Sequence, residues 1–220
     1  MRNFIKKITH PFLKFGLQLF YSKPRNYCYD NICIKVHPNV FPPHLTISTK
    51  ILLDFINPFD IKDKRFLELG CGSGIISLVA AKKEAKVIAT DINETALEYL
   101  KLNASKNNLE VDIVKSNLFE KLEHHTFDYI IINPPYYPKN AKNTKEQAWF
   151  CGENFEYFEN LFLQLPNFIH ENTSCYMILS EDCEIETIKK IGVKNKLNFQ
   201  LVLQKKSSFE RNFIFQVCTN

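Results

Sequence analysis

The chain has 220 residues and a formal net charge of +4 at pH 7. Its composition, 45% hydrophobic and 24% charged, is typical of a soluble globular protein, and the length fits one domain with an appendage. The mild positive charge permits an RNA partner without requiring one.

The cysteines exclude two kinds of small scaffold. Their number is odd and no C-x-x-C pair occurs, so neither a zinc ribbon nor a disulfide framework is predicted. We expect most of them to be reduced core residues, which favours a cytoplasmic protein, and no metal is implied. The seven are Cys28, Cys33, Cys71, Cys151, Cys175, Cys183 and Cys218.

Residues 2–25 are rich in basic and aromatic side chains. The sequence His10-Pro11 and the charge of Lys14 interrupt the apolar stretch, so it is too short and too polar to span a bilayer, and no membrane association is expected. We expect a helix laid on the domain, with a substrate-docking arm as the alternative. Residues 1–45 are thus predicted to form a helical and hairpin extension, and residues 46–220 the main domain.

Two local elements follow. Residues 29–36 alternate in polarity around an Asp30-Asn31 turn signal, which predicts a small β-hairpin. A helix is predicted over residues 47–55, where Thr46 or Ser48 could cap its start.

The stretch from Phe66 to Gly74 predicts a cofactor cradle. A short apolar run ends at glycines on alternate positions, 70, 72 and 74, and a helix-compatible run follows, so the pattern is strand, tight loop and helix. Glycine allows sharp bends and close approach to a ligand. Asp91 ends the next apolar run, where an acid can take ribose hydroxyls in a doubly wound fold. The alternative is a turn that binds nothing.

The remaining elements predict the fold class. The pattern predicts a helix over residues 93–104 and strands over residues 111–115, 127–132 and 175–180. Strands and helices thus alternate along the chain, which indicates a mostly parallel sheet. Two further strands, predicted over residues 199–204 and 212–217, would form an antiparallel terminal hairpin. We therefore expect an α/β, Rossmann-like fold with a seven-stranded sheet and helices on both faces. Residues 139–152 are predicted to be a loop that carries the single tryptophan, Trp149, either closing over the substrate or simply packing.

The tetrapeptide Asn133-Pro134-Pro135-Tyr136 ends the fourth strand and predicts the chemistry. The prolines favour extended geometry and lack N–H groups, which leaves the Asn133 side-chain oxygen and the Pro134 carbonyl as two rigid acceptors beside the Tyr136 ring. Such a pair suits a planar NH2 group, whose delocalised lone pair makes it a poor nucleophile, and Tyr136 could stack on the substrate plane. The alternative is a proline-rich turn.

Together these motifs resemble the class I S-adenosylmethionine-dependent methyltransferases. Within that class the chain resembles the methyltransferase small domain proteins, which include glutamine methyltransferases of the HemK/PrmC type and their RNA-guanine and RNA-adenine relatives. The resemblance covers about residues 40 to 180. It implies that Glu68, Gly70, Gly72 and Gly74 surround the methionine part of S-adenosylmethionine, which becomes S-adenosylhomocysteine, that Asp91 takes its ribose hydroxyls, and that Asn117 lies at its adenine. It further implies that Asn133, Pro134, Pro135 and Tyr136 form the site for the acceptor nitrogen.

The chain departs from that family in two places. Many relatives carry Asp at the position of Asn117, and the long N-terminal domain that resembles the release-factor-docking part of glutamine methyltransferases cannot fit into about forty residues. The substrate therefore stays open between a protein glutamine, which we slightly prefer, and an exocyclic amine of adenine or guanine in rRNA or tRNA. A small activating protein is a possible partner, and a non-catalytic S-adenosylmethionine-binding module is the alternative of a different class.

Overall fold

A seven-stranded sheet organises the chain in the computed structural model, which describes residues 22–44, 46–207 and 210–219. Its strands are β3 (Arg65–Leu69), β4 (Lys86–Asp91), β5 (Asp112–Lys115), β6 (Tyr129–Ile132), β7 (Ser174–Ser180), β8 (Leu197–Lys206) and β9 (Arg211–Thr219). The order across the sheet is β5-β4-β3-β6-β7-β9-β8. The first five pair in parallel, and β9 and β8 add an antiparallel hairpin, so the predicted fold class is confirmed.

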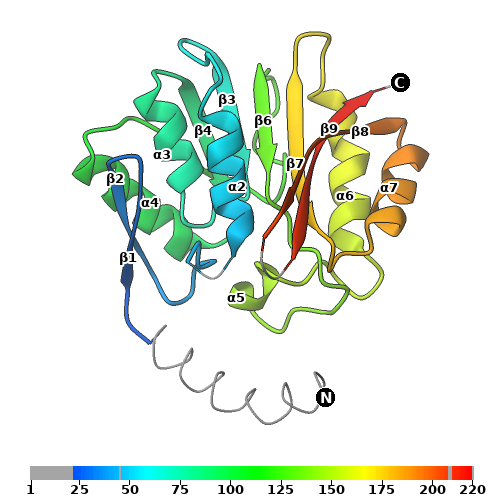
Figure 1. Cartoon of the computed structure of the whole chain (residues 1–220), viewed down its shortest axis with the longest axis horizontal. Coiled ribbons are helices and arrows are strands. Elements are labelled where there is room, and N and C mark those ends of the chain that lie inside the picture. Colours follow the sequence, from blue (N-terminus) through cyan, green and yellow to red (C-terminus); the bar gives the residue numbers. More distant parts are fainter. Residues whose placement is uncertain (1–21, 45, 208–209, 220) are drawn as a thin grey trace.

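Helices cover both faces of this sheet (Figure 1). On one face α2 (Ile47–Ile56), α3 (Ile75–Lys82) and α4 (Glu94–Lys106) bury an aliphatic core, and on the other α6 (Glu156–Gln164) and α7 (Ile185–Lys194) bury a core rich in phenylalanine. The central strand β6 is buried on both faces at Ile130, Ile131 and Ile132, which explains its continuous apolar run. A 3-10 turn (Leu165–Asn167) follows α6 at Pro166.

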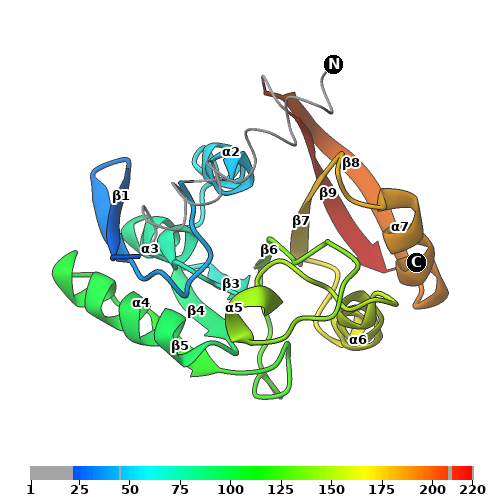
Figure 2. The same ribbon diagram turned by 90° about the horizontal axis from the view of Figure 1, so that it is seen from below.

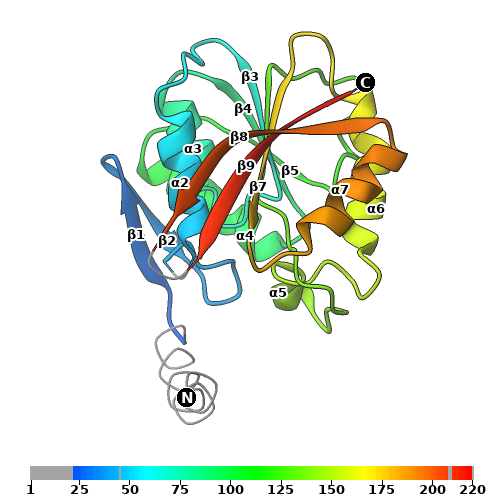
Figure 3. The ribbon, with the colours of Figure 1, turned by 45° about the vertical axis from the view of Figure 1, so that its right-hand side comes forward.

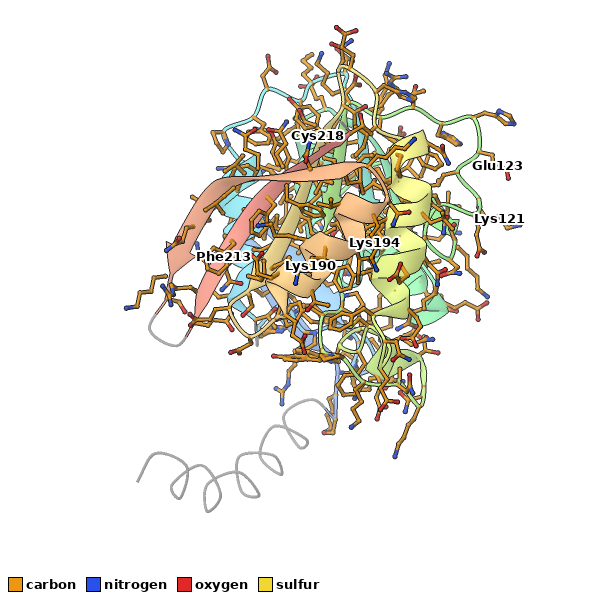
Figure 4. All side chains as sticks on the ribbon, turned by 90° about the vertical axis from the view of Figure 1, so that its right-hand side faces the viewer. Lys121, Glu123, Lys190, Lys194, Phe213 and Cys218 are labelled. Atoms are coloured by element: carbon orange, nitrogen blue, oxygen red, sulfur yellow. A yellow bond between two sulfur atoms is a disulfide. The ribbon has the colours of Figure 1, made fainter. Side chains whose placement is uncertain are left out.

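The terminal hairpin closes one edge of the sheet. Strands β8 and β9 lie beyond β7 and in front of α2 when the molecule is turned (Figure 3). Lys205 of β8 forms an ion pair with Asp54 of α2 at 3.2 Å, which ties the hairpin to that helix. When the right-hand side of Figure 1 faces the viewer, Lys190 and Lys194 of α7 lie on the outer surface (Figure 4).

The N-terminal hairpin consists of β1 (Arg25–Tyr29) and β2 (Ile32–Val36), as predicted. Its Ile32, Ile34 and Val36 are buried in the same core as α2 and α3. The division of the chain at residue 45 stays a prediction. Most of the helix predicted over residues 2–25 lies outside the described residues.

Two findings in this part of the chain were not anticipated from the sequence. Cys28 and Cys33 are paired across the hairpin and joined by a disulfide, a contact that the turn creates and that their spacing does not reveal. The other cysteines are free, and Cys71, Cys151 and Cys175 are buried as expected. Thr46 occupies the N-cap position of α2 but makes no capping bond with its side chain, and its buried hydroxyl has no partner.

None of the helices in the described part of the chain has both the length and the apolar composition needed to cross a membrane.

Two of the loop glycines allow a controlled test of stability. Gly70 and Gly74 both have left-handed φ angles, +73° and +72°, but an added Cβ meets nothing within 4 Å at Gly70, whereas at Gly74 it would lie 3.1 Å from Cγ of Leu100 and closer to its Cδ1. We expect Gly70→Ala to cost about 1 kcal/mol of backbone strain and Gly74→Ala about 1–3 kcal/mol more from overpacking. Urea denaturation of the two variants measures the difference, and equal losses would contradict the predicted clash.

Candidate active site

A cavity of about 510 Å³ opens at the carboxyl ends of β3, β4 and β6. Those ends lie behind the short helix α5 (Thr144–Gln147) when the molecule is seen from below (Figure 2). The volume is within the range of small-molecule sites. Among the residues predicted for the site, those that line the cavity are Glu68, Gly70, Gly72, Asp91, Asn117, Asn133 and Pro135.

The glycine loop is held in place by the end of β4. The amide of Cys71 donates to the Thr90 carbonyl at 2.7 Å, and the amide of Gly72 donates to Asp91 Oδ2 at 2.8 Å. These bonds fix a turn that needs positive φ angles at its glycines. Cys71 is 4% exposed and burial raises the pKa of its thiol, which agrees with the expectation of a reduced core residue.

Asp91 uses both carboxylate oxygens on backbone amides. Besides the bond from Gly72, its Oδ1 accepts from Asn93 N at 2.9 Å, and burial raises the pKa of the carboxyl group. Each oxygen still has a lone pair for a further donor, because a carboxylate offers about four acceptor positions. Asp91 can therefore accept from ligand hydroxyls while it supports the loop.

Glu68 is the second acid of the cavity; it is buried, 6% exposed, one residue before the end of β3. Its Oε2 accepts from the amide of Ser77 at 2.8 Å and from the Ser77 hydroxyl. Burial raises the pKa of Glu68 to about 8, although the two bonds from Ser77 act in the opposite direction. Oε1 is left for a positively charged or hydrogen-bonding ligand.

Asn117 follows β5 and lies at the cavity with an exposed side chain. Its Nδ2 donates to Glu120 Oε1 at 2.7 Å. Because that contact uses the amide nitrogen, the side-chain oxygen of Asn117 stays available to accept from an amine.

Asn133 is held from the side of α2. Its Nδ2 donates to Ser48 Oγ at 3.5 Å, across 85 positions of sequence. Ser48 is 3% exposed, and its neighbour Thr49 lines the cavity. Sequence reasoning expected Ser48 as a helix cap and did not identify it in the site.

Three predicted residues are not part of the cavity wall. The remaining glycine of the loop, Gly74, faces Leu100 instead, and Pro134 is buried. The Tyr136 ring packs against Tyr137 with centroids 4.8 Å apart and against the core under α6. Burial raises the pKa of Tyr136, so its hydroxyl stays protonated.

The segment predicted as a loop over residues 139–152 forms one wall of the cavity. It contains α5, and an isolated β-bridge joins its Phe150 to Tyr137, the residue that follows the tetrapeptide. Trp149 packs on Phe41, which lines the cavity, with ring centroids 4.8 Å apart. Tyr157 of α6 also lines the cavity, and neither this tyrosine nor Phe41 carried a signal in the sequence.

These residues fit S-adenosylmethionine on chemical grounds. The acids Glu68 and Asp91 suit hydroxyl and ammonium groups, the side-chain oxygen of Asn117 suits an aromatic amine, and the glycine loop removes Cβ atoms from the cavity wall.

The pKa of Glu68 predicts a pH-dependent stability. Because the folded-state pKa is raised from 4.5 to about 8, the folded protein keeps a proton that the unfolded chain has lost, and stability falls as the pH rises through that window. Glu68→Gln carries no charge, so we expect it to be more stable than the wild type by roughly 1–3 kcal/mol above pH 8 and nearly equal at pH 4.5. Denaturation of both proteins across this range, without ligand, measures the difference. A difference that does not change with pH would contradict a buried, protonated Glu68.

Trp149 provides a natural reporter of the cavity, since it is the only tryptophan in the chain. Phe41 contacts both Trp149 and the cavity, so we expect S-adenosylhomocysteine to change the intrinsic fluorescence of the protein in a saturable way. Phe41→Leu removes the ring contact and should weaken the change. Calorimetric binding without any change in fluorescence would contradict this coupling.

Comparison with known proteins agrees with the geometry. The methyltransferase small domain model matches residues 31–155. The chain is 33% identical over 183 residues to the "Putative protein N5-glutamine methyltransferase" of Methanocaldococcus jannaschii, covering 78% of this chain and 90% of the relative. It is 31% identical over 193 residues to ribosomal RNA small subunit methyltransferase C of Haemophilus influenzae, covering 82% of this chain and 57% of the relative.

Solved structures share the fold. A methyltransferase from Pyrococcus furiosus superposes with a TM-score of 0.64 at 25% identity, over 86% of this chain and 90% of that one. The E. cuniculi Mtq2-Trm112 complex gives a TM-score of 0.63 at 18% identity, over 83% of this chain and 99% of that one, which speaks for the fold alone. With a glycine loop, two acids and Asn133 around one cavity, the chain belongs to the methyltransferase small domain family and is an S-adenosylmethionine-dependent methyltransferase.

Proposed function

We propose that the chain methylates the side-chain nitrogen of a glutamine in a protein substrate. The observation that carries the proposal is that Asn133 lines the same cavity as Glu68 and Asp91, so an acceptor held at Asn133 lies beside the cofactor residues. When bound, S-adenosylmethionine supplies an electrophilic methyl group.

The chain contributes the activation of the nitrogen. An amide nitrogen is a poor nucleophile because its lone pair is delocalised. Asn133 lines the cavity, and its Oδ1 would accept one hydrogen of this nitrogen, favour a pyramidal nitrogen and stabilise the positive charge that develops on it; the Pro134 carbonyl, predicted as a second acceptor, belongs to a residue that does not line the cavity. A nitrogen held at roughly 3 to 3.5 Å from the reacting carbon satisfies near-attack geometry. No covalent enzyme intermediate is needed, and burial raises the pKa of the Cys71 thiol, which makes it a poor nucleophile.

Support for glutamine comes from the relative in Methanocaldococcus jannaschii, whose name gives that substrate and of which the chain spans 90%. The chain spans a smaller share of the ribosomal RNA methyltransferases: it covers 57% or less of the length of the relatives from Haemophilus influenzae and Buchnera aphidicola. The wider coverage favours the glutamine substrate.

An exocyclic amine of an RNA base is the second candidate. Lys139, Lys142 and Lys145 are exposed on the segment that forms one wall of the cavity, and none forms an ion pair with any other described residue. Lys139 lies over the Phe150 ring, 4.9 Å from its centroid, and still keeps its charge. Exposed lysines without an acidic partner beside a site suit a phosphate backbone, and they would make binding steeply salt-dependent.

We also propose a small activating protein as a partner. In support, the Mtq2-Trm112 complex joins a second protein to a chain that shares this fold. A cytoplasmic location is proposed as well, and the buried free cysteines support it.

The acceptor class can be tested by transferring labelled methyl from S-adenosylmethionine into a lysate of cells that lack this protein. We expect the label to be lost on protease digestion and retained on ribonuclease digestion. Loss to ribonuclease alone would contradict the glutamine proposal in favour of an RNA base.

Asn133→Ala provides the matched variant for this assay. Transfer should fall by about 100-fold or more, the scale expected when one preorganised polar group is removed, while calorimetry shows unchanged binding of S-adenosylhomocysteine. Asn172→Ala, an exposed asparagine before β7, is the control and should transfer normally. Normal turnover of Asn133→Ala would remove this residue from the mechanism.

A further inference from the structure

We infer that Ser48 is a positioning residue for methyl transfer, and that it fixes the Asn133 amide with its oxygen toward the acceptor nitrogen. The inference rests on the proposed function, because it concerns the group that receives the NH2 of the substrate.

An asparagine side chain is a poor acceptor unless something fixes its orientation. Its two ends, an oxygen and an NH2 group, have nearly the same shape but opposite hydrogen-bonding character. With the NH2 end toward the substrate, donor would face donor and the acceptor nitrogen would be repelled. The fold must therefore hold one orientation before the substrate arrives.

The local backbone cannot do this through the usual bond. Asparagine side chains in turns commonly accept from the amide two residues further along the chain. Here that residue is Pro135, and Pro134 also precedes it, so neither position offers an N–H. Asn133 Oδ1 is consequently left without a local donor and free to accept from the substrate.

Ser48 supplies the missing restraint at the other end of the amide. Its Oγ accepts from Asn133 Nδ2 at 3.5 Å, the one side-chain bond of Asn133 within the described residues. That distance is at the long end of the hydrogen-bond range, and catalytic contacts of this kind tighten in the reacting complex. Because Ser48 is 3% exposed, water cannot replace its hydroxyl easily.

The start of α2 leaves the Ser48 hydroxyl to this contact. Thr46 stands at the N-cap without a capping bond, and the side chain of Ser48, in the first turn, bonds to Asn133 and not to the helix backbone. The hydroxyl of Ser48 therefore does not cap the start of the helix, although the sequence pattern suits a cap there. It points across to the carboxyl end of β6, which is where the methyl transfer takes place under the proposed function.

A spectroscopic test reads the amide directly and needs no substrate. In protein with 15N-labelled asparagine, the side-chain NH2 pair of Asn133 is the pair that disappears in Asn133→Ala. We expect Ser48→Ala to shift this pair, and Ser48→Thr, which keeps the hydroxyl, to leave it near its wild-type position. An Asn133 pair that is unchanged in Ser48→Ala would overturn the inference.

The kinetic test uses labelled methyl transfer to the lysate acceptor. Ser48→Ala should lower the rate by about 10- to 100-fold, as small misplacements at a reacting centre do, with unchanged binding of S-adenosylhomocysteine, and Ser48→Thr should restore most of it.

If Ser48→Thr does not fold, the double variant Ser48→Ala/Asn133→Ala replaces it. Because Ser48 acts through Asn133, the double variant should be no slower than Asn133→Ala alone. Rate losses that multiply would overturn the inference and leave the proposed function intact, whereas a fully active Asn133→Ala would overturn both.

Discussion

Two hydrogen bonds between the glycine loop and the end of β4 are the constraint on which the site depends. The Thr90 carbonyl and the Asp91 carboxylate accept from Cys71 and Gly72, at 2.7 and 2.8 Å. A turn with left-handed glycines has many alternatives in an isolated chain, and these bonds select one of them. The parallel pairing of β3 with β4 brings the partners together, so the cradle forms only when the sheet does.

The remaining parts of the site gather because parallel strands share a carboxyl edge. Glu68 lies one residue before the end of β3, Asp91 ends β4 and Asn133 directly follows β6, and all three line one cavity. The α2 helix and the segment from Tyr137 to Gly152 then close the cavity from outside the sheet. Buried acids on one side and an amide oxygen on the other divide it into a part suited to a cofactor and a part suited to an acceptor.

Burial gives the two acids of the site their chemical character. Desolvation raises the pKa values of Glu68 and Asp91, and the hydrogen bonds from the Ser77 hydroxyl and from backbone amides only partly offset that penalty. Buried acids with perturbed pKa values cluster at functional sites, where a bound ligand can compensate for the lost hydration. Both acids line the cavity, which agrees with a site built to receive a polar ligand.

The amino-acid sequence by itself determined the succession of strands and helices, and it marked the glycine loop, Asp91 and the tetrapeptide from Asn133 to Tyr136 as candidates for the site, because each depends on local periodicity or on the backbone chemistry of glycine and proline. Only the tertiary structure decided which other side chains reach the site. Ser48, Phe41 and Tyr157 come from segments far apart in sequence, the Tyr136 ring turned toward the core, and Cys28 met Cys33. Such contacts depend on how helices pack on the sheet and on strand register, which no local pattern encodes.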